Sequence, residues 1–436
     1  MDGSRSKPRS VVFVGRGIFG ICGAIECKQR FGTDTEVISI DGEVEAESST
    51  NDVSKITRGD YGKDDLYTRL HNLAIQRWKQ KERQWFGTSP ADSYFHWTGV
   101  SLLSQTPYPM APESYEACSY ETVRKVDPAL ASKCQVFRSE SDVQTLVNPR
   151  LTTFKSGYNN PNAGWIESGA VLRRYVEEAR QCGVVLINES VAKVHRDGVH
   201  LVNGRYIKAD VVVVSCGAWT PFLLPETRQL LRATMQPVFL FEPRSNGDSP
   251  ELAWLGRDQG GGMSPLTLDM AQTGFYCFPF QKRARVLKFG HHGEGYPVSS
   301  AMTAQALRQL EFKVRHLEEA RFVDFLNTVS PGFSENWMVN TFRLCQYCDS
   351  LDSHFLIDKL PSGIICASGG SGHGFKFGPV IGELIADCVE GKTNSDPVMR
   401  EAAQRFRWRT LDPRAVLFEQ ARNTTRILDD VGPSKL

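Results

Sequence analysis

The hydrophobic pattern near the N-terminus is a short apolar run followed by a glycine-rich turn. Ser10–Val14 (SVVFV) is continuously apolar, which is typical of a strand buried inside a parallel sheet. The turn GRGIFG (residues 15–20) follows, and residues 21–29 have the small and apolar spacing of a helix. Glu36–Asp41 (EVISID) is a second strand-like run that ends on an acidic residue. The order of these elements predicts one βαβ unit.

Helical periodicity recurs in the rest of the chain. Apolar residues repeat at four-residue spacing from Leu66 to Trp78, which predicts a helix, and residues 170–180 and 302–316 show comparable patterns. Residues 355–390 run strand, glycine-rich turn and helix.

Strand-like runs lie between these helices. Residues 183–186 and 206–215, the latter with four consecutive valines, predict buried strands. Shorter alternating segments predict an antiparallel sheet, at residues 238–241, 275–280 and 286–290. Residues 85–150 contain aromatic and proline-containing patches, and we assign no helix or strand there.

Composition and charge narrow the class of partner. The 436 residues suffice for two packed cores. Lys and Arg number 51 against 50 Asp and Glu, a formal net charge of +1, which gives no electrostatic reason to expect nucleic acid or an anionic membrane. No stretch approaches the roughly 20 apolar residues of a spanning helix, and the N-terminus lacks an apolar signal region. We therefore expect a soluble intracellular protein with a small-molecule partner.

The last three residues of the sequence resemble a targeting signal. Ser434-Lys435-Leu436 is a peroxisomal signal of the SKL type, and residues 429–433 (DDVGP) read as the flexible polar tail that such a signal needs. The alternative is a chance ending. We expect an import receptor to deliver the protein to the peroxisome.

The glycine-rich turn supplies the first candidate chemistry. A strand leading into G-x-G-x-x-G turns tightly at Gly15, Gly17 and Gly20, admits a pyrophosphate close to the backbone amides and directs a helix N-terminus at its charge. An acid for the ribose hydroxyls is expected about 20 residues later, and Asp41 fits. These residues predict a dinucleotide site without separating NAD from FAD. The alternative is a chance glycine-rich loop.

Later motifs resemble one family. GAWT (217–220) is similar to the segment after a flavin-domain strand in the D-amino-acid and sarcosine oxidase superfamily, and GHGFKF (372–377) resembles the C-terminal flavin-binding signature of sarcosine, pipecolate and fructosyl-amino-acid oxidases. RLCQY (343–347) with HFLID (354–358) resembles the segment in which those enzymes attach FAD to a cysteine. SSTNDVSKI (48–56) looks most like the fungal fructosyl-amino-acid oxidase branch. The motifs keep the family's order over almost the whole chain.

The resemblance implies FAD as cofactor, bonded through Cys345 to its 8α-methyl group. Taken alone, Cys345 and Cys348 form a C-x-x-C pair, which could be a redox pair or half a zinc site. No second motif completes a zinc site, and the eleven cysteines have no regular spacing, so we expect reduced thiols and no metal. The resemblance implies further cofactor contacts from Gly217, Gly372, His373, Gly374, Phe375 and Lys376.

The resemblance also implies oxidase chemistry. Such enzymes remove hydride from the carbon beside an amine nitrogen, the imine hydrolyses, and O2 reoxidises the flavin to give H2O2. Lys288 matches the family's oxygen-activating lysine and Lys55 a cationic residue on the same side. A cation there stabilises the anionic reduced ring and the incipient superoxide. Without the resemblance, Lys288 would read as a solvated strand end.

Substrate orientation is expected to depend on cations that clamp a carboxylate. Lys376 matches one such anchor and Arg58 another, although the sequence departs from the fungal pattern after Ile56. Three residues match positions near the flavin face, each with packing or surface exposure as the alternative: Tyr276, Tyr347 and His292. Three further arginines could add a carboxylate contact or cover the surface: Arg405, Arg407 and Arg409.

The fold implied is α/β, with a Rossmann-like FAD-binding domain (8–84, 151–230 and 345–436) and an interleaved α+β substrate domain (85–150 and 231–344) of mostly antiparallel sheet plus helices. We expect a monomer that oxidises the C–N bond of a secondary amine in an N-substituted or cyclic amino acid, of the fructosyl-amino acid, N-methyl amino acid, saccharopine or pipecolate type. The alternatives are a biosynthetic amine oxidase whose imine cyclises, a dehydrogenase that passes electrons to another protein, and a non-catalytic dinucleotide-binding protein.

Overall fold

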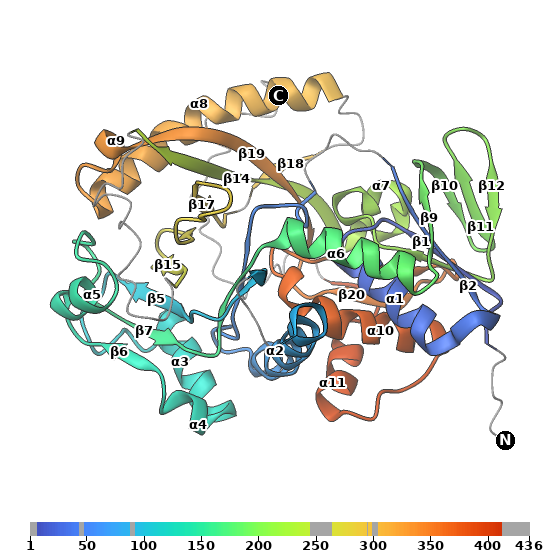
Figure 1. Ribbon diagram of the computed structural model, residues 1–436, viewed down its shortest axis with the longest axis horizontal. Coiled ribbons are helices and arrows are strands. Elements are labelled where there is room, and N and C mark those ends of the chain that lie inside the picture. The colour runs from blue at the N-terminus through green and yellow to red at the C-terminus, as the bar shows by residue number, and fades with distance from the viewer. Residues whose placement is uncertain are drawn as a thin grey trace.

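The computed structural model describes residues 7–42, 48–87, 92–244, 264–293, 295–298 and 304–411. Figure 1 shows two parts side by side, one built on a mainly parallel sheet and the other on a large, mainly antiparallel one. Segments from both ends of the chain meet in the first part, which is the interleaving that the sequence predicts. Across the described ranges, no helix is both long and apolar enough to cross a membrane.

The first part contains, within the described residues, a six-stranded sheet. Its strands lie in the order β20 (Leu356–Lys359), β21 (Ile365–Ser368), β13 (Val211–Val214), β1 (Ser10–Val14), β2 (Glu36–Asp41) and β9 (Val185–Asn188). Neighbouring strands are parallel except β20 and β21. The predicted bounds of β1 and β2 are confirmed because each strand is a buried apolar run.

Helices cover this sheet. They are α1 (Ile18–Phe31), α2 (Asp65–Phe86), α6 (Ser168–Gln181), α10 (Gly378–Glu390) and α11 (Pro397–Arg405). The predicted stripe on α2 is buried, and at its end Trp78 is fully enclosed and donates a hydrogen bond from Nε1 to the carbonyl oxygen of Lys376 at 2.7 Å. This bond fixes the C-terminal glycine-rich turn against α2.

The second part contains a large sheet around two long strands, β14 (Leu231–Pro243) and β19 (Trp337–Ser350), which pair antiparallel over their whole lengths. Beyond β14 the order continues through β17 (Leu287–His291), β16 (Phe275–Cys277), β15 (Leu266–Leu268), β5 (Val100–Ser104), β7 (Ser156–Asn160) and β6 (Gln135–Phe137). β18 (Tyr296–Pro297) pairs with β14 on the same edge as β17, opposite β19. α8 (Ala304–Val329) packs on the apolar face of this sheet.

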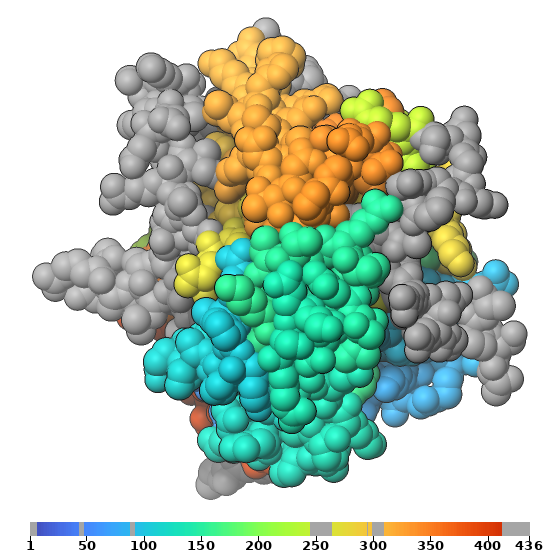
Figure 2. Space-filling model, turned by 90° about the vertical axis from the view of Figure 1, so that its left-hand side faces the viewer, coloured from blue at the N-terminus to red at the C-terminus, as the bar shows by residue number. Residues whose placement is uncertain are grey.

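The remaining elements are short. One three-stranded sheet contains β10 (Val191–His195), β11 (Gly198–Leu201) and β12 (Tyr206–Lys208), and another β3 (Lys55–Thr57), β8 (Gly164–Ile166) and β4 (Phe95–His96). The other helices are α3 (Tyr115–Val126), α4 (Pro128–Ala131), α5 (Glu140–Leu146), α7 (Thr220–Leu223) and α9 (Phe333–Asn336). In Figure 2, α8 and α9 (orange) form the upper part of one face and the segment with α3 to α5 (teal) the lower part.

The structure corrects two predictions. The strand predicted over residues 206–215 is two strands in different sheets, because the chain turns at Asp210, whose carboxylate accepts hydrogen bonds from the backbone of Arg9 and Ser10. The predicted domain boundaries also differ from the pairing. β7 lies after residue 151 but pairs with β5 and β6, and β19 continues through residue 345 without a break.

Candidate active site

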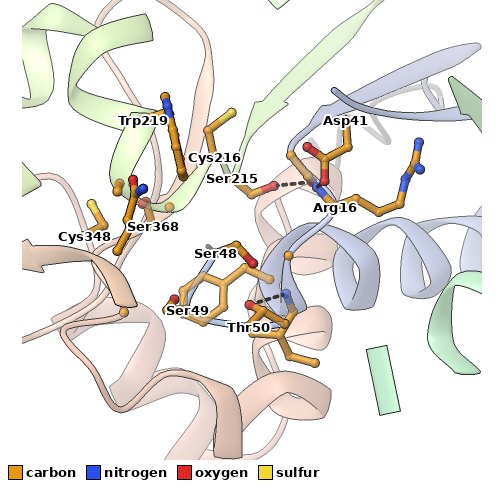
Figure 3. Close-up of a pocket in the computed structure, with 18 of the residues that line it drawn as sticks. Arg16, Asp41, Ser48, Ser49, Thr50, Ser215, Cys216, Trp219, Cys348 and Ser368 are labelled. Atoms are coloured by element: carbon orange, nitrogen blue, oxygen red, sulfur yellow. Dashed lines mark hydrogen bonds between the residues drawn. The ribbon is translucent and has the colours of Figure 1, made fainter. Parts of the chain in front are cut away.

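A cavity of about 640 Å³ lies at the carboxyl ends of β1, β2 and β13. This volume is within the range of cofactor sites. Segments far apart in the sequence form its walls, from residues 14–19, 40–42, 48–51, 215–219, 346–348, 367–368, 370–372 and 374–375. Figure 3 shows Arg16 and Asp41 on one side of the cavity and Trp219, Cys348 and Ser368 on the other.

The turn after β1 requires glycine. Gly15 has a φ of +97°, and a Cβ on Gly20 would lie 1.9 Å from the carbonyl oxygen of Gly15. Gly17 is the N-cap of α1 and provides no side-chain cap, and the residues at the start of the helix line the cavity. The N–H of Ile18 donates to Oγ1 of Thr50 at 3.3 Å. A helix N-terminus of this kind binds anions.

Asp41 closes one side of the cavity. Its Oδ2 accepts a hydrogen bond from the backbone N–H of Arg16 at 3.0 Å, and burial raises the pKa of its carboxyl above the ordinary value. The Arg16 guanidinium donates to Asn188 Oδ1 and to the Ile187 carbonyl oxygen, both at 2.8 Å. Arg16 therefore covers the ends of β2 and β9 while Asp41 faces the cavity.

The later glycine-rich motifs lie across the cavity from this turn. Gly217 lines it together with Ala218 and Trp219. Of the predicted C-terminal contacts, Gly372, Gly374 and Phe375 line the large cavity. His373 and Lys376 instead line a smaller cavity beside it.

The smaller cavity has a volume of about 90 Å³. Lys55, Tyr347, Gly372 and Phe375 line both cavities, so the two share a wall. The structure brings together here every residue predicted for catalysis or substrate binding: Lys55, Arg58, Tyr276, Lys288, His292, Tyr347 and Lys376.

A hydrogen-bonded chain holds Lys376. Its Nζ donates to Oη of Tyr61 at 2.8 Å, Tyr61 Oη lies 3.1 Å from Nδ1 of His373, and Nε2 of His373 lies 3.0 Å from the carbonyl oxygen of Ser353. A carbonyl only accepts, so Nε2 carries a proton, and in the neutral imidazole Nδ1 accepts from Tyr61. The Tyr61 oxygen is thus oriented to accept from Lys376. Burial, reinforced by Arg58, lowers the pKa of Lys376 well below its ordinary value.

Arg58 is the second cation of the smaller cavity. Its guanidinium donates to Oη of Tyr115 at 2.9 Å and to the carbonyl oxygen of Asp60. Tyr61 and Tyr115 are site residues that the sequence did not identify. Neither belongs to a recognisable motif, and Tyr115 reaches the cavity only because α3 packs against α2.

Lys288 is buried, in contrast to the solvated strand end that its position alone suggests. Its Nζ donates to Oδ2 of Asp52 at 2.5 Å and to the carbonyl oxygen of Ser54 at 2.6 Å. Burial lowers the pKa of Lys288 to about 8, and the Asp52 carboxylate opposes this shift. The sequence did not identify Asp52, although it lies inside the SSTNDVSKI motif and three residues before Lys55.

Aromatic side chains and one glycine complete the smaller cavity. Tyr276 and Tyr347 are hydrogen bonded to each other. Gly372 has a φ of +74°, and a Cβ there would lie 2.6 Å from Cε2 of Tyr347 and 3.1 Å from Cε1 of His292. Glycine therefore lets the turn approach both rings.

Cys345 and Cys348 face opposite sides of β19. Cys345 is fully buried beside Val238, Leu240 and Val286, whereas Cys348 lines the large cavity. Successive side chains alternate along a strand, so residues three apart point in opposite directions. This geometry excludes a joint C-x-x-C site. Cys345 is not among the residues that line the cavity, but Gln346 and Tyr347 beside it are.

The C-terminal arginines lie away from both cavities. Arg405 pairs with Asp64 at 2.8 Å and Arg409 with Asp352 at 2.5 Å. Arg407 offers its backbone carbonyl to Arg409. These contacts hold the segment after α11 in place, which favours the second of the two predicted roles. Ser434-Lys435-Leu436 lies outside the described residues.

Known proteins share this architecture. The model of the family described as FAD dependent oxidoreductase matches residues 10–388. L-saccharopine oxidase of Schizosaccharomyces pombe is 25% identical and the alignment covers 93% of this chain and 94% of that protein. Monomeric sarcosine oxidase of Bacillus sp. is 26% identical, and the alignment covers 91% of this chain and 98% of that protein. Fructosyl amine:oxygen oxidoreductase (amadoriase I) from Aspergillus fumigatus shares the fold, with a TM-score of 0.70, 21% identity and 98% and 95% of the two chains covered. The chain therefore belongs to the FAD dependent oxidoreductase family.

Proposed function

We propose that this protein oxidises the C–N bond of a secondary amine in an N-substituted or cyclic amino acid, with O2 as acceptor and H2O2 as product. One observation carries the proposal. Two cations, the buried Lys376 and the half-buried Arg58, lie in a small cavity that shares a wall with the large one. The relatives named saccharopine oxidase and sarcosine oxidase support it.

The large cavity fits FAD. The amides at the start of α1 suit its pyrophosphate, and Asp41 suits the ribose hydroxyls at the end of the second strand. Bound there, FAD would accept hydride from the substrate and pass the electrons to O2. The glycines of the turn leave room for close approach of the phosphates, which larger side chains would fill.

The residues of the smaller cavity orient the substrate. Arg58 and Lys376 would clamp its carboxylate, since paired cations hold a carboxylate in a defined direction. The Tyr61 chain positions Lys376 for this contact. An incoming carboxylate would also favour the charged form of Lys376, whose pKa burial and Arg58 lower. Tyr276 and Tyr347 then enclose the amine side of the substrate.

A peroxide-coupled screen tests the proposed function. Purified protein is assayed with N-methyl, cyclic, fructosyl and N-carboxyalkyl amino acids, and we expect peroxide with at least one class. Anaerobic bleaching of the flavin without reoxidation in air would instead identify a dehydrogenase. A colourless protein would identify the non-catalytic alternative, and a cyclised imine product would identify the biosynthetic one.

We further propose that FAD is covalently attached at Cys345. Its place in RLCQY and its position on β19, one residue before the cavity wall, support this assignment. After acid precipitation, the wild-type pellet should remain yellow, whereas Cys345→Ser should release the flavin. Cys348→Ser, on the opposite face of the same strand, is the matched control and should retain it. Release from the wild type would contradict the assignment.

We also propose that the protein is peroxisomal, on the basis of the C-terminal Ser434-Lys435-Leu436. We propose in addition that it is a monomer, which the name of the relative monomeric sarcosine oxidase supports. A fluorescent protein fused to the N-terminus should enter peroxisomes, and deletion of the last three residues should leave it outside them. Size-exclusion chromatography with light scattering tests the monomer.

A further inference from the structure

One carboxylate faces three cations in the wall beside the two cavities. The Asp52 cluster comprises Asp52, Lys55, Lys288 and Arg343. Oδ2 of Asp52 lies 2.5 Å from Nζ of both Lys55 and Lys288, and Oδ1 lies 3.2 Å from the Arg343 guanidinium. The side chain of Asp52 is 0% exposed and that of Lys288 1%. Buried charges persist only where they are paired and hydrogen bonded, so each member depends on the others.

The cluster holds Lys288 in one orientation. Two of the three ammonium protons are directed at Asp52 and at the carbonyl oxygen of Ser54, and Nζ lies 4.8 Å from the centre of the Phe278 ring. Lys288 also lines the smaller cavity. One ammonium proton is therefore left for the cavity side.

Lys55 extends the cluster to the boundary between the cavities, because it lines both of them. With one carboxylate against three cations, the cluster keeps a surplus of positive charge at the place where an anionic reduced flavin would lie. Asp52 therefore leaves a net positive charge in the cluster, and its carboxylate fixes the positions of the cationic groups around it.

We propose that Asp52 is a positioning residue that keeps Lys288 charged and directed at the site where the reduced flavin meets O2. The inference rests on the proposed oxidase function and adds to it a residue that acts through Lys288.

The charges that face Lys288 come from two segments. Asp52 lies before β3 and Lys55 begins it, Cys345 faces Lys288 from β19, and β14 presents Val238 and Leu240. The ring of Phe278, just after β16, lies against the ammonium, and Tyr276 of β16 and Tyr347 of β19 line the same cavity as Lys288. Burial would raise the pKa of Asp52, but Lys288, Lys55 and Arg343 hold it well below its usual value. Asp52 is therefore ionised throughout the range in which Lys288 titrates.

The test is Asp52→Asn, which removes the charge and keeps the shape. The flavin is reduced photochemically, and its reoxidation by O2 is followed by stopped flow from pH 6 to 10. In the wild type we expect the rate to fall with loss of the Lys288 proton near pH 8. In Asp52→Asn this fall should move about one pH unit or more to lower pH, because the charged form of Lys288 loses its counter-ion.

A double-mutant cycle separates positioning from a general effect. Asp52→Asn should produce no further shift in a Lys288→Met background, since its effect passes through Lys288. Glu113→Gln, which removes an exposed ion pair with Lys63, is the control and should keep the wild-type profile. An unshifted profile in Asp52→Asn, or an equal shift with and without Lys288, would overturn the proposal.

The flavin-free protein gives an independent readout. Between pH 8 and 10.5, unfolded Lys288 binds a proton that the folded protein has lost, so the stability of the wild type should rise with pH across this window. In Asp52→Asn the rise should begin at lower pH, and an unchanged onset would count against the proposal.

Two further outcomes are decisive. Should Asp52→Asn fail to fold, recovery of folding in Asp52→Asn/Lys288→Met would support the pairing, and failure of both would show that Asp52 serves the fold instead. Because photoreduction needs no amine, failure of the substrate screen would overturn the proposed function without affecting this test.

Discussion

Tyr61 links the substrate cavity to the C-terminal turn, and the direction of its hydrogen bonds follows from a single carbonyl group. Because the Ser353 carbonyl can only accept, Nε2 of His373 carries a proton, and in the neutral imidazole Nδ1 then accepts from Tyr61, which leaves the Tyr61 oxygen to accept from Lys376. A phenylalanine at position 61 would keep the ring but leave Lys376 without this partner.

We expect Tyr61→Phe to raise KM for a carboxylate substrate about 10-fold with little change in kcat, as for the loss of one hydrogen bond to a charged group of roughly 1.5 kcal/mol. Steady-state peroxide assays measure both parameters. Tyr120→Phe is the control, because the Tyr120 ring lies tilted against that of Tyr158, outside both cavities. A selective fall in kcat would argue that Tyr61 takes part in the chemistry instead.

At the same scale, Lys288→Met should slow reoxidation of the flavin by about 100-fold, as expected when a preorganised charge is removed from a water-excluded site. Reduction of the flavin by substrate should change far less, because hydride leaves the substrate before O2 reacts. Stopped-flow measurement of the two half-reactions compares them directly. Equal losses in both would contradict an oxygen-specific role.

At the scale of elements, the local sequence pattern was sufficient to predict the structure where a single segment of the chain forms it. The βαβ unit at Gly15 was predictable because strand, turn and helix are consecutive. Asp52 and Tyr115 were not, since their partners Lys288 and Arg58 lie far from them in the sequence. Periodicity identifies an element but not its neighbours, and this cluster exists only after β3, β17 and β19 have come together.

The helix predicted over residues 302–316 extends to Val329, and the added part contributes Phe322, Leu326 and Val329 to the core. Phe322 is fully buried, with its ring centre 4.6 Å from that of Phe239 and 4.8 Å from that of Phe275. Phe322→Ala should lower the free energy of unfolding by about 3–5 kcal/mol, as for other buried phenylalanines. Phe312→Ala removes an exposed ring from the same helix and should change the free energy of unfolding little. Chemical denaturation measures the free energy of unfolding of both variants. Equal effects would mean that α8 does not depend on this contact.

At the scale of the molecule, the cofactor cavity is where the separate segments of the chain meet. The turn after β1, the end of β2, the segment after β13 and the end of β19 all line it. A ligand that contacts all of them should therefore stabilise the whole fold and not one part alone. The gain follows ligand concentration and reaches about 2.7 kcal/mol at 100 times Kd.

This coupling predicts a difference between two flavins. In flavin-free Cys345→Ser protein, FAD should raise the melting temperature clearly more than FMN at equal concentration, because FMN lacks the adenosine half that Asp41 and the turn at Gly15 would bind. Asp41→Asn should reduce the FAD shift and leave the FMN shift unchanged. Equal shifts for the two flavins would mean that the glycine turn does not bind the dinucleotide, and the cavity would then hold the ring half of the cofactor alone.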